Sequence, residues 1–329
     1  MNKLTISGAP HIHSDQSVYK IMWGVVIALI PSLLISVYFF GFSALTTVAV
    51  AVASCLFFEW AIQKYMLRVK PTVNDGSAVI TGLLLAFNLP SNLPFWMTIL
   101  GALVAIGIAK MIFGGLGNNP FNPALVGRCF LLISFPVAMT TWPVLRPLFG
   151  EQVIADAITG PTPFAFIKEQ IAAGIPMDVI MDSVPSYANM LMGARGGALG
   201  EISAIAIILG GLFMLWKKII SWHIPVTFIG SAFIFAGILY CVNPEIYINP
   251  FVHILSGGLL LGSVFMATDM VTSPMTNTGK IIFGLGCGVL TILIRVFGAY
   301  PEGVSFAILI MNAVTPFINK GFKPRVYGK

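Results

Sequence analysis

The chain of 329 residues is 57% hydrophobic and only 9% charged, and its mean hydropathy is +0.92. Charged residues make up about a quarter of an ordinary soluble domain, so this composition excludes a soluble protein and indicates an integral membrane protein with many spans. The net charge of +6 is better explained by loops that orient a membrane protein than by nucleic-acid binding, because the basic residues do not alternate with aromatic ones.

Ten apolar segments are expected to cross the membrane, since a spanning helix needs about 20 apolar residues. Eight of them are clear, while the third and the eighth are shorter and interrupted by glycine. In chain order the predicted segments are Ile21–Phe40, Ala44–Lys64, Gly76–Leu89, Phe95–Phe113, Leu125–Ala138, Leu199–Trp216, Pro225–Val242, Phe251–Thr268, Lys280–Phe297 and Val304–Ile318.

Orientation follows from the basic residues, which are enriched in cytoplasmic loops. With the N-terminus in the cytoplasm and all ten segments crossing, thirteen of the 18 Lys and Arg residues are cytoplasmic, Lys110 among them, and three are extracytoplasmic. Arg128 and Arg295 fall within segments. Both termini are therefore predicted to be cytoplasmic. The predicted division is a cytoplasmic arm at 1–20, a first five-helix half at 21–139, an extracytoplasmic loop at 140–198, a second five-helix half at 199–318 and a cytoplasmic tail at 319–329.

The two predicted halves run in opposite directions, which is the inverted-repeat architecture of many transporters. Residues 81–85 (TGLLL) in the third segment are similar to residues 257–261 (GGLLL) in the eighth, and residues 112–114 (IFG) are similar to residues 296–298 (VFG). The fold class predicted is an all-α polytopic membrane protein.

Polar, irregular stretches flank the short segments at 88–94, 114–123 and 267–274. Irregular backbone is tolerated at membrane depth only where protein or water covers it, so these stretches are expected to line a central site. The alternatives are tight turns whose amide side chains satisfy their own backbone, and structural ion pairs. The candidate residues for a cofactor or an ion path are Glu59, Asn118, Asn119, Asn122, Arg128, Thr268, Asp269, Thr272 and Arg295.

A second candidate site is the turn Thr159-Gly160-Pro161-Thr162 in the predicted extracytoplasmic loop. Gly and Pro form turns in any loop, so the pattern by itself indicates only a turn. The four cysteines form no CxxC motif and no cluster with histidine. No metal or iron–sulfur centre held by this chain alone is therefore expected.

Five stretches in order along the chain carry a resemblance to a known family. They include the irregular stretch after the fourth segment and the Tyr-Pro-Glu-Gly stretch before the tenth. With these stretches the chain resembles the RnfD family of membrane subunits of the Rnf complex, a ferredoxin:NAD oxidoreductase that moves ions. The related membrane subunit of the sodium-pumping NADH:quinone oxidoreductase is the next most similar, and the compact length favours the RnfD family. The stretches are Ala9–His13, Asp75–Leu85, Gly114–Ala124, Ala267–Thr272 and Tyr300–Asn312.

The resemblance implies two flavins. The family motif is Ser/Thr-Gly-Ala-Thr with FMN esterified to its last Thr, which corresponds to Thr162 here. The motif departs from the family at Pro161, which replaces Ala. The family also implies a non-covalent riboflavin among the helices. The motif neighbours of Thr162 are Asp156, Thr159, Gly160, Pro161 and Pro163.

The resemblance further implies a fold like that of urea and ammonium transporters, and a bacterial inner (cytoplasmic) membrane location. Electrons would arrive from an extracytoplasmic subunit with covalent flavin, pass through FMN and riboflavin, and drive Na⁺ or H⁺ translocation. Iron–sulfur subunits would complete the complex, and a flavin transferase would attach the FMN. The chain would not be catalytic alone. The alternatives are a component of the quinone-reducing relative, or a solute channel or transporter of the same fold without a redox role.

Overall fold

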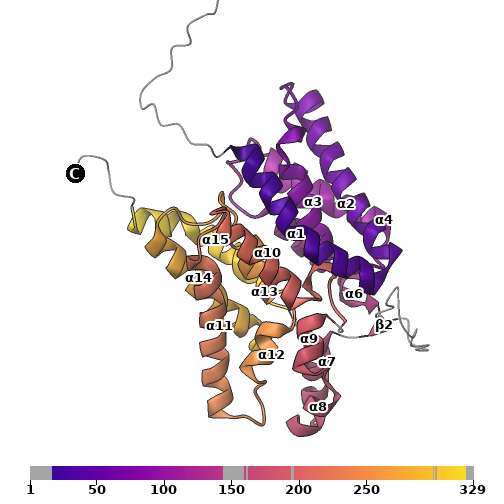
Figure 1. Ribbon diagram of the computed structural model, residues 1–329, viewed down its shortest axis with the longest axis vertical. Coiled ribbons are helices and arrows are strands. Elements are labelled where there is room, and N and C mark those ends of the chain that lie inside the picture. Colours follow the sequence, from indigo (N-terminus) through magenta and orange to yellow (C-terminus); the bar gives the residue numbers. More distant parts are fainter. Residues whose placement is uncertain are drawn as a thin grey trace, which may run out of the picture.

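The computed structural model describes residues 17–143, 159–160, 162–193, 196–298, 300 and 302–323. Helices make up most of it, and two groups of helices lie side by side (Figure 1). The first group contains five helices joined by one 3-10 turn and two π-helical stretches. In chain order its elements are α1 (Val18–Phe40), α2 (Phe42–Ala61), η1 (Ile62–Met66), η2 (Val73–Asp75), α3 (Ser77–Phe87), α4 (Phe95–Leu103), η3 (Val104–Met111) and α5 (Pro123–Ser134).

The second group follows the 3-10 turn η4 (Leu199–Glu201). Its elements are α10 (Ala204–Trp216), α11 (His223–Val242), α12 (Pro250–Leu255), α13 (Leu259–Leu261), the π-helical η5 (Gly262–Met266), α14 (Asn277–Phe297) and α15 (Val304–Gly321). Glycines let the helices approach closely. A Cβ at Gly210 of α10 would lie 2.2 Å from the carbonyl oxygen of Ala28 in α1, and one at Gly288 of α14 would lie 2.5 Å from that of Phe228 in α11.

The predicted loop at 140–198 is more structured than expected. It contains α7 (Pro163–Ala172), α8 (Met177–Ser183) and α9 (Tyr187–Met192), which bury a small core of their own with Val252 of α12. After the short α6 (Pro136–Thr140), strands β1 (Trp142–Pro143) and β2 (Thr159–Gly160) pair antiparallel, with Trp142 opposite Gly160. The prediction of an all-α chain is therefore wrong in this small detail.

The chain is a multi-pass membrane protein. Five helices of the described part are long and apolar enough to cross a membrane, and large side chains such as Leu34, Phe57 and Ile234 remain exposed on them, as lipid contact requires. The five are Val18–Phe40, Phe42–Met66, His223–Val242, Asn277–Phe297 and Val304–Gly321. Four shorter apolar helices are Ser77–Phe87, Phe95–Met111, Pro123–Ser134 and Ala204–Trp216.

Three predicted segments differ in detail from the helices. The third is short but continuous in α3, because Gly82 packs against α2, where a Cβ would lie 2.7 Å from Cα of Val52. The eighth is broken as predicted. It stops at Leu255 and resumes at Leu259, and Gly257 between them has a φ of 70°. The fifth ends at Ser134, where Phe135 leaves the helical conformation before α6.

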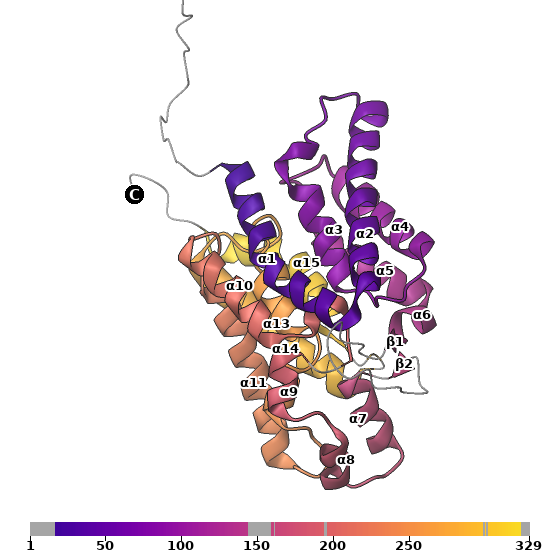
Figure 2. The same cartoon turned by 45° about the vertical axis from the view of Figure 1, so that its right-hand side comes forward.

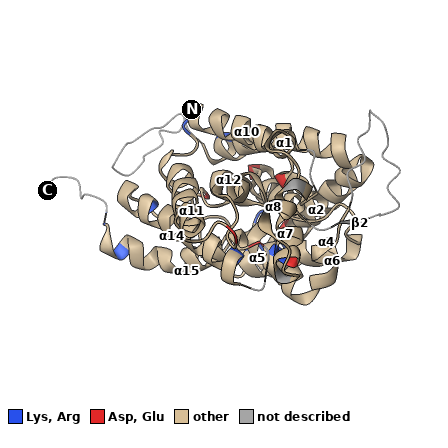
Figure 3. Ribbon diagram, turned by 90° about the horizontal axis from the view of Figure 1, so that it is seen from below, with Lys and Arg blue, Asp and Glu red and all other residues tan. Residues whose placement is uncertain are grey.

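The two ends of the molecule differ. The start of α1 and the end of α15 lie at one end, called here the terminal end, and α7 and α8 lie at the other, the α7 end (Figure 2). Charged residues interrupt the ribbon at few places, and several lie in the middle of the bundle (Figure 3). The buried charged residues are Glu59, Lys110, Arg128, Glu201, Arg295 and Glu302.

Candidate functional site

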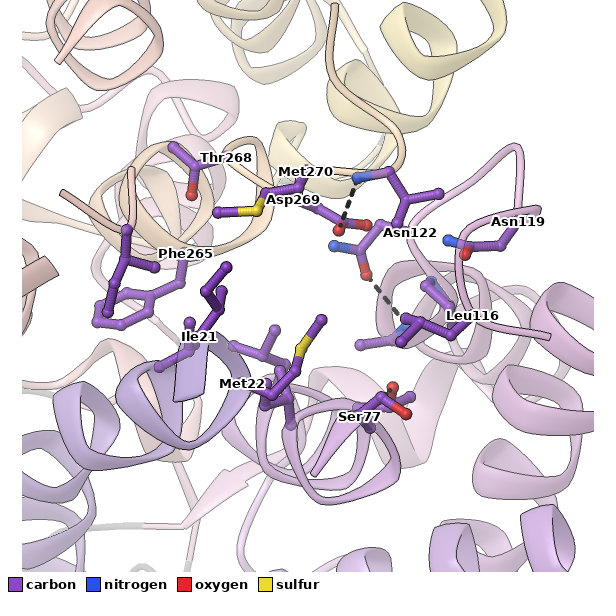
Figure 4. Close-up of a pocket in the computed structure, with 18 of the residues that line it drawn as sticks. Ile21, Met22, Ser77, Leu116, Asn119, Asn122, Phe265, Thr268, Asp269 and Met270 are labelled. Atoms are coloured by element: carbon purple, nitrogen blue, oxygen red, sulfur yellow. Dashed lines mark hydrogen bonds between the residues drawn. The ribbon is translucent and has the colours of Figure 1, made fainter. Parts of the chain in front are cut away.

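A cavity of about 770 Å³, partly open to solvent, lies at the terminal end. Both groups of helices line it, and Figure 4 shows Asn122 and Asp269 approaching from one side while Met22 and Ser77 face them from across. Most of its walls are apolar side chains of α1, α3, α10 and η5. The main polar residues of the lining are Ser77, Lys110, Asn119, Asn122, Thr268 and Asp269.

Four of the predicted site residues therefore meet in this cavity, although they come from two stretches far apart in sequence. The amides there also serve their own turns, as the alternative interpretation proposed. The Asn122 side chain accepts from the N–H of Ala124 at 3.1 Å and so begins α5, and its amide nitrogen donates to the carbonyl of Met266 at 3.2 Å. Asn119 donates to the carbonyl of Phe121 at 3.1 Å. The turn and the cavity wall are thus the same structure.

Asp269 is the carboxylate on the cavity wall. It accepts hydrogen bonds from the backbone N–H of Val271 at 3.3 Å and from the Thr272 hydroxyl at 3.2 Å. Burial raises the pKa of Asp269, while these two hydrogen bonds and the charge of Lys110 lower it. Thr272 thus belongs to the site through Asp269, whereas Asn118 is exposed and does not line the cavity.

Lys110 corrects the sequence analysis, which assigned it to a cytoplasmic loop. It lies in η3, is 1% exposed, and donates to Oε2 of Glu59 and to Oγ of Ser77, both at 2.7 Å. The predicted residue Glu59 is thus half of a buried ion pair and lies behind the cavity wall. The available signal was the position of Lys110 inside a predicted spanning segment, where a lone charge requires a partner.

Arg128 lies away from the cavity, at the contact between the two groups of helices. Its guanidinium donates to Oδ1 of Asn88 at 2.5 Å and to Oε2 of Glu302, and it lies 3.5 Å from Oε1 of Glu201. A Cβ at Gly258 would lie 2.4 Å from that same Glu201 oxygen, so the break in the eighth segment approaches this cluster. The sequence analysis did not select Glu201 or Glu302, although Glu201 stands inside a predicted segment.

The second predicted site begins α7. Thr162 is its N-cap, with the hydroxyl accepting from the N–H of Ala165 at 3.2 Å, and Pro163 occupies the first helical position. The Thr162 side chain is only 3% exposed. Thr159 and Gly160 form β2, whereas Asp156 and Pro161 lie outside the described residues.

A second cavity of about 780 Å³ lies beside the first turn of α7. Phe164 contributes to its wall, with its ring centroid 5.0 Å from that of His253 and 4.6 Å from Cζ of Arg295. Arg295 also donates to the carbonyl of His253 at 2.6 Å and to that of Ser256 at 3.3 Å. Lys168, whose pKa is lowered by burial, donates to the carbonyl oxygens of Arg295, at 3.5 Å, and of Gly298. Two cations thus lie close to the start of α7.

The predicted candidate residues therefore form three groups instead of one. Asn119, Asn122, Thr268 and Asp269 share the cavity at the terminal end, with Glu59 behind it. Arg128 is central, and Arg295 belongs to the α7 end.

Known proteins match the chain over almost its whole length. A model of the NQR2, RnfD, RnfE family matches residues 5–328. The most informative relatives are all membrane-complex components designated D. The chain is 45% identical over 327 residues to that of the Na(+)-translocating ferredoxin:NAD(+) oxidoreductase complex of Acetobacterium woodii, with 99% of this chain and 95% of the relative covered. It is 44% identical over 328 residues to that of the proton-translocating ferredoxin:NAD(+) oxidoreductase complex of Clostridium ljungdahlii, covering 99% and 97%. The counterpart in the ion-translocating oxidoreductase complex of Yersinia pseudotuberculosis is 39% identical over 347 residues, covering 99% and 98%.

Proposed function

Because the chain belongs to the NQR2, RnfD, RnfE family, we propose that it is the membrane subunit of an ion-translocating electron transport complex and that it carries two flavins. The observation that carries the proposal is the pair of cavities at opposite ends of the bundle. One lies beside two cations and the start of α7, and the other has apolar walls and a carboxylate. Flavins would supply the redox chemistry, and the protein would supply position and electrostatics.

The first flavin is FMN, joined to Thr162 as a phosphoester. An ester oxygen at this position still accepts from the N–H of Ala165, and the attached phosphate lies at the N-terminus of α7, where helix N–H groups favour an anion. Lys168 and Arg295 add positive charge nearby. Because Thr162 is only 3% exposed, a transferase reaches its hydroxyl before the surrounding chain packs over it.

The second flavin is riboflavin, which carries no phosphate, in the cavity at the terminal end. Ligand cavities of this kind combine mostly apolar walls with a few polar groups that fix orientation. The one lysine in the lining is paired with Glu59, and the other charged lining residue is Asp269, so the wall repels a phosphate. Asn119, Asn122 and Thr268 supply amide and hydroxyl groups at the polar edge.

We propose that the ten apolar segments all cross a bacterial inner membrane, with the terminal end cytoplasmic and the α7 end extracytoplasmic. The basic residues favour this orientation. The broken eighth segment and the short third segment support two inverted halves, as in urea and ammonium transporters.

In this arrangement electrons enter from an extracytoplasmic subunit with covalent flavin, reach FMN on Thr162, and pass through the bundle to the riboflavin and the iron–sulfur subunits. The relatives' names say Na(+)-translocating in one case and proton-translocating in another, at nearly equal identity. The transported ion of this chain is therefore proposed only as Na⁺ or H⁺.

Mass spectrometry tests the covalent flavin directly. The chain is expressed with a flavin transferase, purified and digested, and the peptide that contains Thr162 is expected to carry an FMN-sized mass increment. An unmodified peptide from a sample in which the transferase modifies its other substrates would contradict the electron-carrier role. It would favour a solute channel or transporter, for which the cavity at the terminal end is also large enough.

A further inference from the structure

Lys110 is a buried charge to which the proposed function assigns no task. Its residue lines the cavity at the terminal end, yet its ammonium is held from behind by Glu59 and Ser77, each at 2.7 Å. We infer that Lys110 sets the reduction potential of the ring bound in this cavity and that Glu59 and Ser77 act as positioning residues for it. The inference rests on the proposed function, because it requires the phosphate-free flavin to occupy this cavity.

The ammonium of Lys110 is fixed in place by a chain of side chains on both sides. Behind Glu59, the Gln63 side chain donates to Oε1 of Glu59 at 3.4 Å and accepts from the N–H of Thr72 at 2.7 Å. The Ser77 hydroxyl accepts from Lys110 and donates to Oδ1 of Asp75 at 2.7 Å. A charge held in this way does not reorganise when a neighbouring group gains charge, and so its effect on that group is large.

The sign of the effect follows from Coulomb's law. A ring that gains electrons becomes more negative, so a fixed cation on the wall stabilises the reduced form and raises the potential. The effect is stronger in a buried site than in water, because the effective dielectric constant there is lower. Lys110 is the cation in the cavity lining, and the carboxylates around it are Glu59 from α2, Asp75 from η2 and Asp269 from the loop after η5.

Glu59 acts on the ring only through Lys110, because it does not belong to the cavity lining. It offsets part of the charge of Lys110 and holds the ammonium at the wall. Removing the Glu59 charge alone therefore exposes the ring to an uncompensated cation. Removing Lys110 alone leaves a buried carboxylate, which costs about 3–5 kcal/mol when one partner of a buried pair is lost, so this variant can fail to fold. The double variant Lys110→Met/Glu59→Gln avoids the unpaired charge.

The test is a spectroelectrochemical titration of the non-covalent flavin in the purified complex. We expect Glu59→Gln to raise its midpoint potential, the double variant to lower it, and Lys110→Arg, which keeps the charge, to stay closest to the unsubstituted protein. Lys64→Met removes an exposed lysine elsewhere on the chain and is expected to leave the potential unchanged. The flavin content of each sample is measured first by extraction.

The two possible failures are distinguishable. If the unsubstituted complex releases no non-covalent flavin, the proposed function fails at this cavity. If the flavin is present at full content but the potential is the same in the Glu59→Gln and double variants, the flavin assignment stands and the role of Lys110 is overturned. Shifts of the opposite sign would also overturn it, because Coulomb's law fixes the direction.

Discussion

The two ends of the molecule present opposite electrostatics to their cavities. At the α7 end, Lys168 and Arg295 lie around Phe164 close to a helix N-terminus. At the terminal end, Lys110 is compensated by Glu59, and the wall carries Asp269. Both cavities have similar empty volumes, about 780 and 770 Å³, so size does not distinguish them.

The comparison teaches that one membrane scaffold can select two related ligands by charge. A phosphate is stabilised by the cations and helix dipole at the α7 end and repelled by the carboxylate at the terminal end. The proposed FMN and riboflavin sites follow this difference. Each of the variants below removes one side of the contrast and is expected to leave the other intact.

The largest expected effect is that of Thr162→Ala. The alanine has no hydroxyl to esterify, so covalent flavin fluorescence of the chain on a denaturing gel is expected to be lost completely. The matched control is Thr159→Ala in the same motif, which is expected to keep the fluorescent band. The non-covalent flavin at the terminal end is expected to be retained in both variants. A band that persists in Thr162→Ala would end the assignment.

Arg295→Gln is expected to loosen the α7 end. Arg295 donates to the carbonyls of His253 and Ser256 and lies over the Phe164 ring. A buried group that loses its hydrogen-bond partner costs about 1–3 kcal/mol. Hydrogen exchange of the α7 peptide is expected to accelerate, while peptides of the cavity at the terminal end keep their protection.

The control for Arg295→Gln is Arg295→Lys, which keeps the charge but not the fork of donors. It is expected to give an intermediate exchange rate. Equal acceleration at both ends of the molecule would show that Arg295 stabilises the whole bundle and would contradict its local role.

Asp269→Asn is expected to weaken the discrimination against phosphate at the terminal end. Removing one charge near the bound ligand changes the free energy of FMN binding by roughly 1–2 kcal/mol, or about tenfold in affinity, and leaves riboflavin binding nearly unchanged. Fluorescence quenching with added riboflavin and FMN measures both affinities. Asp75→Asn is the matched control, because Asp75 does not belong to the cavity lining. A variant that still binds FMN as weakly as the original protein would remove the charge explanation.

The sequence predicted the apolar helices well because lipid imposes a composition that can be read locally. The five long helices all fall on predicted segments, and the break at Gly257 is where glycine interrupts the eighth. The helices α7 to α9 were missed because they are short and polar, and their stability depends on contacts with Val252 and other residues outside the loop.

The buried charges could not be paired from sequence, because their partners are distant along the chain. Lys110 meets Glu59 from 51 positions away, and Arg128 meets Glu302 from 174. The sequence indicates that a charge inside a span requires a partner, but only the packing of helices selects which one. The same reasoning explains why nine candidate residues predicted as one site divide into three groups.

The smallest expected effect is a pH dependence of stability from Asp269. Burial raises its pKa in the folded protein above the ordinary value near 3.9. Between these two values the folded state binds more protons than the unfolded state, so stability falls as pH rises through this window. Asp269→Asn has no proton to lose and is expected to become the more stable protein above the window, by about 2 °C or less in Tm. Thermal unfolding of both proteins in detergent, from acidic to neutral pH, measures the difference, in which other carboxylates cancel. A difference that grows toward acidic pH would mean that ionised Asp269 stabilises the fold, and that the terminal end favours a negative charge instead of merely tolerating it.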